Sequence, residues 1–207
     1  MKKLLPILTA TLICNSVFSQ PQKLVSNCTI NYAVSSSDTK KAGEFAKASK
    51  TIYIKGKDIR VDINSASFNQ TFFYNSNTGE VTILKEVGQS KYISHYNSGE
   101  WERENEMYNG IQLSQTGVTK NILNYECREA ILQLKNGSSY TIYYAPVIVP
   151  SVTENIFEFK NVPGLVLEYE TSLPSAEKVK YTATKINFDP VPAFQFEIPK
   201  NGYRVLH

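Results

Sequence analysis

Histidines and clustered acidic side chains are the first places to look for chemistry in this sequence. The 2 histidines, His95 and His207, do not have the spacing of a metal-ligand pair. A hydrolase site built on His95 is compatible with spacing alone, but a single histidine is more often structural or solvated than catalytic. The sequence has no Gly-x-Ser-x-Gly elbow and no phosphate-binding glycine loop. We therefore expect a protein that is not an enzyme and that has no metal site and no cofactor.

Four glutamates, Glu100, Glu102, Glu104 and Glu106, alternate with other residues. In an extended strand their carboxylates would line one face, where they could hold a cation or supply an acid–base pair. A solvated loop or an edge strand has the same pattern, because charge at a sheet edge discourages aggregation. We favour the solvated loop or edge strand.

The N-terminus has the order of segments found in a secretory signal peptide. Lys2 and Lys3 precede an apolar stretch, and small or apolar residues occupy 17–19. We predict a signal peptide over 1–19 and a single domain over 20–207, exported to the periplasm or secreted. No later stretch is long and apolar enough for a transmembrane helix. Loss of two lysines lowers the net charge from +3 to about +1, and so nothing indicates nucleic-acid binding.

The cysteines outside the predicted signal peptide are Cys28 and Cys127. Export would place them in an oxidising compartment, where an even number of cysteines favours pairing. We predict a disulfide between them. The alternative is two buried free thiols that pack as small apolar side chains.

The segments that must position these residues are short strands, because apolar and polar residues alternate between turn signals. Asn136-Gly137 between two apolar runs is the strongest hairpin signal. One stretch, 40–50, has the spacing of a short helix. The sequence therefore predicts a mainly β fold with strands over 28–34, 52–54, 59–63, 72–74, 81–84, 91–96, 127–134, 140–145, 165–169, 179–188 and 194–198.

Aromatic residues are dense on these predicted strands, with 13 Tyr, 10 Phe and 1 Trp in the chain. Such residues can fill an ordinary core, or they can line the apolar interior of an incomplete barrel that holds a ligand. Alternation alone does not separate the two. If the interior is a cavity, the candidate ligand-binding residues are Tyr53, Phe72, Tyr92, Tyr143, Tyr144, Phe159 and Leu165.

The second half of the chain carries four segments that resemble known exported proteins. Residues 121–130 (NILNYECREA) and 159–167 (FKNVPGLVL) resemble motifs of the GLPGLI family. Between them, the hairpin that ends at 143–146 resembles the family's aromatic strand and following loop. Residues 194–203 (FQFEIPKNGY) resemble the tail of lipoprotein-carrier domains of the LolA/LolB type.

This resemblance implies a curved, half-open antiparallel β-barrel with one or two short helices as a lid. It also implies a non-enzymatic binding or carrier protein whose apolar interior takes a lipid or an acylated protein. The alternative of the same fold is a module that binds another cell-envelope protein and has no lipid ligand. Within the family-naming motif, Pro163-Gly164 suits a type II turn, in which the glycine has positive φ.

Overall fold

The computed structural model describes residues 21–36, 45, 47–172 and 178–206. The predicted signal peptide lies outside these residues, as does most of the helix predicted over 40–50. Strand β3 (Ser49–Lys55) occupies the end of that predicted helix. Within the described part, no helix is long and apolar enough to cross a membrane.

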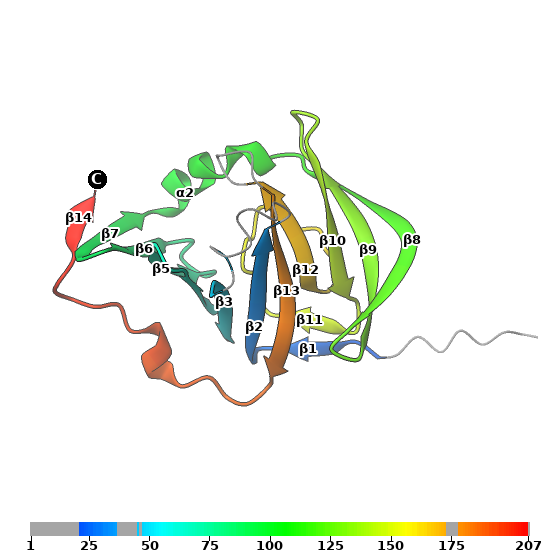
Figure 1. Cartoon of the computed structure of the whole chain (residues 1–207), viewed down its shortest axis with the longest axis horizontal. Helices are drawn as coiled ribbons and strands as arrows, with labels where there is room; N and C mark the ends of the chain where they lie inside the picture. Colours follow the sequence, from blue (N-terminus) through cyan, green and yellow to red (C-terminus); the bar gives the residue numbers. More distant parts are fainter. Residues whose placement is uncertain (1–20, 37–44, 46, 173–177, 207) are drawn as a thin grey trace, which may run out of the picture.

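The fold is mainly β, as predicted, and is dominated by one sheet of twelve strands (Figure 1). The remaining two strands form a parallel ribbon, β1 with β11. The elements are β1 (Lys23–Val25), β2 (Asn27–Ser36), β3 (Ser49–Lys55), β4 (Asp58–Asn64), β5 (Asn69–Asn75), β6 (Val81–Val87), β7 (Ser90–Tyr96), α2 (Ser98–Glu104), the 3₁₀ helix η1 (Glu106–Tyr108), β8 (Gln112–Ile122), β9 (Tyr125–Gln133), β10 (Ser139–Ala145), β11 (Ile148–Pro150), β12 (Leu165–Ser172), β13 (Lys178–Asn187), the 3₁₀ helix η2 (Ala193–Phe196) and β14 (Arg204–Leu206).

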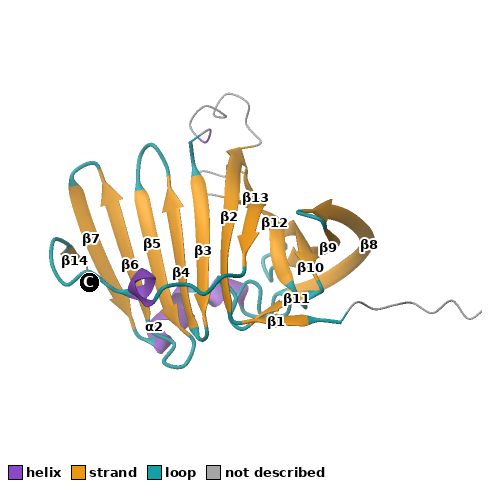
Figure 2. Ribbon diagram, turned by 90° about the horizontal axis from the view of Figure 1, so that it is seen from below, coloured by secondary structure: helices purple, strands orange, loops and turns teal. Residues whose placement is uncertain are grey.

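The large sheet consists of two antiparallel halves. Strands β2 to β7 pair in chain order, and β8, β9, β10, β12 and β13 form the other half. Pairing of β13 with β2 joins the halves, and β14 adds to β7 in parallel. The sheet is curved in Figure 2, and its two ends, β14 and β8, do not pair with each other in the described part.

Alternation along each strand decides which side chains face the core. On β2, Cys28, Ile30, Tyr32 and Val34 are buried while the residues between them are exposed or half-buried. The β9–β10 hairpin also forms as predicted. Gly137 adopts the left-handed conformation in the turn, with φ of 87°, and Asn136 does not.

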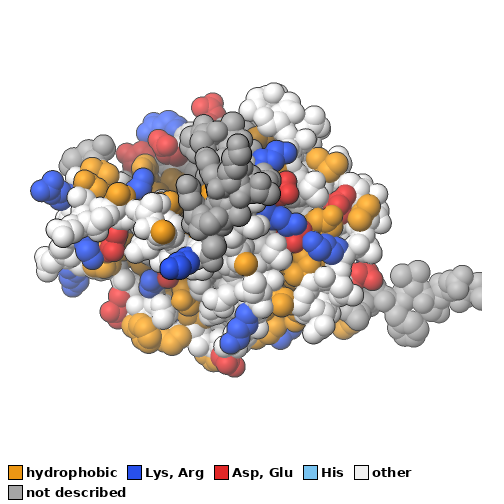
Figure 3. All heavy atoms as spheres, viewed as in Figure 1, with side chains coloured by type: hydrophobic (Ala, Val, Ile, Leu, Met, Phe, Trp, Pro, Cys, Tyr) orange, Lys and Arg blue, Asp and Glu red, His pale blue; other side chains and the backbone are white. Residues whose placement is uncertain are grey.

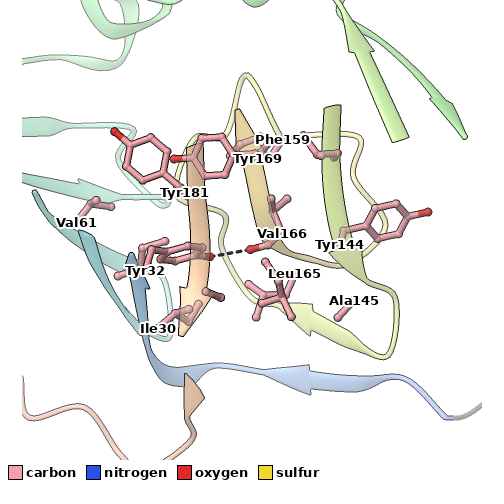
Figure 4. Close-up of a cluster of buried hydrophobic side chains, with 14 of the residues drawn as sticks. Ile30, Tyr32, Val61, Tyr144, Ala145, Phe159, Leu165, Val166, Tyr169 and Tyr181 are labelled. Atoms are coloured by element: carbon pink, nitrogen blue, oxygen red, sulfur yellow. Dashed lines mark hydrogen bonds between the residues drawn. The ribbon is translucent and has the colours of Figure 1, made fainter. Parts of the chain in front are cut away.

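The main core lies where β2, β13 and β12 adjoin, and Figure 4 shows part of it. Tyr32 donates a hydrogen bond of 2.7 Å from its hydroxyl to the carbonyl oxygen of Val166. Phe159 packs edge-on against Tyr169 with ring centroids 5.3 Å apart. The cavity that remains beside Tyr32 and Phe159 is only about 20 Å³, so this part of the interior is filled.

Different segments of the chain pack on the two faces of strands β3 to β7. Helix α2 lies over one face, here called the inner face, and the C-terminal segment from 188 to 206 crosses the other, the outer face (Figure 1). Arg60 holds this segment through a 2.8 Å hydrogen bond from Nη1 to the carbonyl oxygen of Gln195. The Tyr203 hydroxyl donates to Oε1 of Glu86 at 2.6 Å.

Two predicted elements of secondary structure are wrong. The strand predicted over 194–198 is the 3₁₀ helix η2 and an extended link. The glutamate segment is not an extended strand or loop, because residues 98–104 form α2. Asn97 starts this helix with a capping box: its side chain accepts from the backbone N–H of Glu100, whose carboxylate accepts from the backbone N–H of Asn97.

The expected type II turn at Pro163-Gly164 is also wrong, because Gly164 does not have a positive φ. Glycine is needed there for another reason. A Cβ atom at Gly164 would overlap the carbonyl group of Ala145 at the end of β10 and lie 2.9 Å from Cα of Pro146. The segment before β12 can therefore approach β10 closely only without a side chain at this position.

Candidate functional site

A cavity of about 220 Å³ lies on the inner face, between the sheet and α2. Strands β4, β5 and β6 form its apolar floor. Helix α2 and the segment that follows it contribute Trp101 and Asn105, and the loop 154–158 closes one side. The floor consists of Val61, Ile63, Phe72, Tyr74 and Ile83, together with one polar side chain, Gln70 on β5.

Trp101 ties α2 to the floor of this cavity. Its ring lies 5.4 Å from that of Phe72 and 5.4 Å from that of Tyr96, both in tilted contacts. Asn105, just beyond the helix, donates from Nδ2 to the carbonyl oxygen of Trp101 at 2.9 Å. The capping box at one end and this bond at the other hold the indole over the apolar floor.

A buried lysine forms the polar end of the cavity. Lys50 on β3 is paired with Glu154, and their side chains are 6% and 8% exposed. The Lys50 ammonium also donates to the Tyr169 hydroxyl at 2.5 Å. It lies 5.0 Å from the ring centroid of Tyr169 and 4.9 Å from that of Tyr181. An ammonium taken out of water needs such partners, and it has a carboxylate, a hydroxyl and aromatic faces.

The loop that supplies Glu154 also supplies a second buried carboxyl, Glu158. Asn155 shapes the loop, since its side-chain oxygen accepts from the backbone N–H groups of Phe157 and Glu158, each at 3.1 Å. Its amide nitrogen donates to Oε2 of Glu158 at 3.0 Å. Burial raises the pKa of Glu158 to about 7, and nearby Glu154 acts in the same direction.

Glu158 also borders a second, larger cavity of about 500 Å³. Tyr108 and Tyr140 line this cavity, with Leu134 and Ile131 from β9 and its turn. Burial raises the pKa values of both tyrosines, and the neighbouring Glu158 adds to the effect. Glu158 thus stands in the wall between the two cavities.

The structure separates the seven residues predicted to line an apolar interior. Phe72 lines the inner-face cavity. Phe159 and Leu165 lie in the filled core, where the remaining space is about 20 Å³. Tyr92 is half-buried. It lies on the same face of β7 as Ser94 and Tyr96, but it is not part of the wall of the inner-face cavity.

The other three predicted residues point elsewhere. Tyr53 is on the outer face, where Arg60 lies 5.6 Å from its ring. Tyr143 donates a hydrogen bond to Glu129 and is half-buried. Tyr144 is fully buried, and Figure 4 shows its ring directed away from Tyr32.

The predicted disulfide is not formed: Cys28 and Cys127 are both free and buried. Cys28 is on β2 and Cys127 on β9, with β13, β12 and β10 between them in the sheet. Each thiol packs in the core as a small apolar group, which is the alternative that the sequence left open. Burial raises the pKa of each to about 11.

The wall of the inner-face cavity includes neither His95 nor the four glutamates at 100, 102, 104 and 106. His95 is exposed and its Nδ1 is hydrogen-bonded to Oγ1 of Thr82 at 3.0 Å. Within the described residues, no three His, Cys, Asp or Glu side chains are grouped so as to hold a metal ion. Basic and acidic side chains are interspersed on the face shown in Figure 3.

Sequence reasoning missed the buried polar residues Lys50, Glu154 and Glu158. One signal was available for the lysine, because Lys50 has the same parity as the buried Ile52 and Ile54 on β3. A lysine at an inward position is rarely buried without a partner. The glutamates gave no comparable signal, since they lie in an irregular loop.

Comparison with protein-family models finds no match, and comparison with curated proteins finds no related sequence. Comparison with solved structures finds matches. That of PNGF-II matches with a TM-score of 0.51 and 13% identity, over 86% of this chain and 30% of that chain. That of MucB matches with a TM-score of 0.45 and 8% identity, over 84% of this chain and 58% of that chain. This chain therefore spans less than two thirds of either structure. At 13% identity the likeness to PNGF-II shows the fold alone.

Proposed function

We propose that this chain is an exported, non-enzymatic binding protein with a LolA-like, half-open barrel, and that its inner-face cavity holds the apolar part of a lipid-like ligand. The observation that carries the proposal is a cavity of about 220 Å³ between an apolar sheet floor and a helix. Ligand sites are commonly concave and apolar with a few polar groups. The sequence motifs of the GLPGLI and LolA/LolB type support the same fold.

The interior has one region that is packed as a core and another that keeps a cavity. The region around Tyr32 and Phe159 is packed, with about 20 Å³ of free space, and supplies stability. The region lined by Val61, Phe72 and Trp101 keeps its space, although it lies on the same inner surface. A chain that only needed a stable core would gain by filling this space as well.

The test is a titration with unbranched apolar chains of increasing length, followed by displacement of a fluorescent apolar probe. Burying one methylene contributes about 0.8 kcal/mol, so affinity should rise about fourfold per carbon and then level off once the cavity is full. Phe72→Ala should weaken binding. The matched control is Tyr53→Ala, an aromatic truncation on the outer face, which should leave binding unchanged.

A different function, an interaction module for another envelope protein, is favoured by one feature. Strand β8 ends the sheet, has 11 residues and is mostly exposed. An open edge of this length can pair with a strand of another chain. If folded protein binds no apolar chain of any length, the interaction module becomes the better proposal.

A further inference from the structure

A cleft of different character lies on the outer face, beneath the C-terminal segment. This segment crosses the sheet on its way from β13 to β14 (Figure 2). Between the segment and strands β4, β5 and β6 there remains a space of about 280 Å³, here called the outer cleft. The outer cleft shares no lining residue with the inner-face cavity. The two spaces therefore lie on opposite faces of the same strands.

The floor of the outer cleft is mostly polar. Residues that pair across the strands form it in two rows, one of Asn64, Asn69 and Glu86 and one of Asp62, Thr71 and Leu84. A segment that packs on a sheet is expected to cover apolar side chains. The C-terminal segment does so only in part, because Tyr203 packs on the small apolar cluster that includes Leu84. Polar side chains are left facing open space.

These polar side chains have hydrogen-bonding capacity to spare. Within the described residues, the side chains of Asn64, Asn69, Thr71 and Glu197 make no hydrogen bond. Each amide has two donors and an acceptor oxygen, the hydroxyl donates and accepts, and the carboxylate only accepts. A ligand that displaces water from them must therefore supply donors and acceptors together.

Arg60 and Asp62 add a donor and an acceptor that are already held in place. Nε of Arg60 donates to Oδ1 of Asp62 at 2.8 Å, and Nη1 donates to the carbonyl oxygen of Gln195 at 2.8 Å. The rings of Tyr53 and Phe73 lie 5.6 Å and 5.4 Å from the guanidinium carbon. Nη2 of Arg60 and Oδ2 of Asp62 have no partner in the described part of the chain. Binding to a preorganised pair costs little side-chain entropy.

The lining as a whole suits a neutral ligand. The carboxylates of Asp62, Glu86 and Glu197 repel an anion, and the Arg60 guanidinium repels a cation. A purely apolar ligand would desolvate the amides without replacing their hydrogen bonds.

The cleft also has an apolar part, formed by Phe73, Leu84, Pro199 and Tyr203. A sugar ring combines a rim of hydroxyl groups with an apolar face of C–H groups, and aromatic faces attract the positive edge of such groups. Drug-sized ligands fill pockets of about 300–1,000 Å³, so a cleft of about 280 Å³ suits a smaller ligand with the size of a single sugar ring.

We infer that the outer cleft binds one neutral pyranose unit of a carbohydrate, whose hydroxyl groups bond to Asn64, Asn69 and the Arg60–Asp62 pair while its apolar face lies against the apolar part of the cleft. The source of this unit is either a free monosaccharide or the end of a longer glycan. This second site is independent of the proposed lipid-binding function, because the two spaces share no residue.

The test is a titration of the isotope-labelled mature chain followed by NMR. The probes are the methyl α-D-pyranosides of glucose, galactose and mannose, and N-acetylglucosamine. At least one should bind with a dissociation constant of about 1 mM or below, and should shift backbone resonances in 60–64 and 69–73 but not in β9. The corresponding open-chain polyol should bind at least tenfold more weakly, since it must be ordered on binding.

Substitution links the binding to the named residues. Asn69→Ala should weaken binding about threefold to tenfold, because it removes one or two hydrogen bonds. Asn69 is exposed, so the variant should fold, and an unchanged urea midpoint checks this. Asn64→Ala, at the position paired with Asn69, provides a second variant with the same expected loss. The matched control is Asn121→Ala, an exposed asparagine on β8, which should leave binding unchanged.

Each contrary outcome has a definite meaning. Failure of all four sugars to bind would overturn the carbohydrate site and leave the proposed function of the inner-face cavity untouched. Shifts confined to residues that line the inner-face cavity would overturn the assignment to the outer cleft. Equal binding of the polyol and the sugar would overturn recognition of a ring. Tighter binding of a disaccharide that ends in the same sugar supports a glycan as the source, and equal binding supports a free monosaccharide.

Discussion

Glu158 should make the stability of this domain depend on pH, and the substitution Glu158→Gln should remove that dependence. The carboxyl is buried, and burial raises its pKa from 4.5 to about 7. The titratable groups around it are Glu154, Lys50, Tyr140 and Tyr108. Gln keeps the shape of the side chain and an oxygen that can accept from Asn155, but it does not ionise.

The sign and size of the effect follow from proton linkage. Below pH 4.5 the carboxyl is protonated in both the folded and the unfolded chain, and the favourable contribution is complete. As pH rises from 4.5 through 7, the unfolded chain releases this proton before the folded one does, so the free energy of unfolding falls. Each pKa unit corresponds to 1.36 kcal/mol, so a shift from 4.5 to about 7 amounts to about 3 kcal/mol.

Urea denaturation of both proteins between pH 4.5 and pH 8 measures this difference. The free energy of unfolding of the unchanged protein should fall relative to that of Glu158→Gln by about 3 kcal/mol. Glu86→Gln serves as the control, because hydrogen bonds from Tyr203 and Lys91 lower the pKa of Glu86. Ionised Glu86 contributes stability above pH 4.5 that is lost only as pH falls below that value, so between pH 4.5 and pH 8 the curve of Glu86→Gln should run parallel to that of the unchanged protein. Parallel curves for the unchanged protein and Glu158→Gln would refute the burial argument.

Three further changes test the packing and the buried polar groups. Gly164→Ala should lower the free energy of unfolding by about 1–3 kcal/mol, since its Cβ overlaps backbone atoms, whereas Gly99→Ala in α2 should be neutral or stabilising; chemical denaturation distinguishes them. Cys28 and Cys127 should react slowly with a thiol reagent in the folded protein and completely in urea without reductant, and two unreactive sulfurs in urea would show a disulfide. Lys50→Met leaves a buried carboxylate without its counter-ion and should cost about 3–5 kcal/mol; a thermal midpoint equal to that of the unchanged protein would contradict the ion pair.

Local patterns in the sequence determined most of the strands. Residues that pair across a hairpin lie close together in the chain, and alternation together with a turn glycine is enough to define β3 with β4 and β9 with β10. Edge elements were missed or misassigned because one or both faces are exposed. Strand β8 is mostly exposed and has no apolar alternation to reveal it, and β14 has only 3 residues.

Long-range packing decided the position of the candidate site. Tyr53 on β3 and Phe72 on β5 lie on opposite faces of the sheet. Both faces carry aromatic residues, because the C-terminal segment covers the outer face and α2 the inner one. Apolar–polar alternation along a strand shows that its two faces differ, but it does not show which face borders a cavity.

The polar end of the cavity depends even more on the tertiary structure. Lys50 and Tyr169 lie 119 positions apart in the chain, and Glu154 and Glu158 come from an irregular loop with no periodic signal. Folding of that loop against β3 and β12 gives the lysine its partners and buries both carboxyl groups. The sequence by itself thus determined most of the strands, although it placed Lys50 at the end of a predicted helix and not on β3. Only the folded chain decided which charges meet around Lys50, because burial and pairing depend on contacts between segments that are remote in sequence.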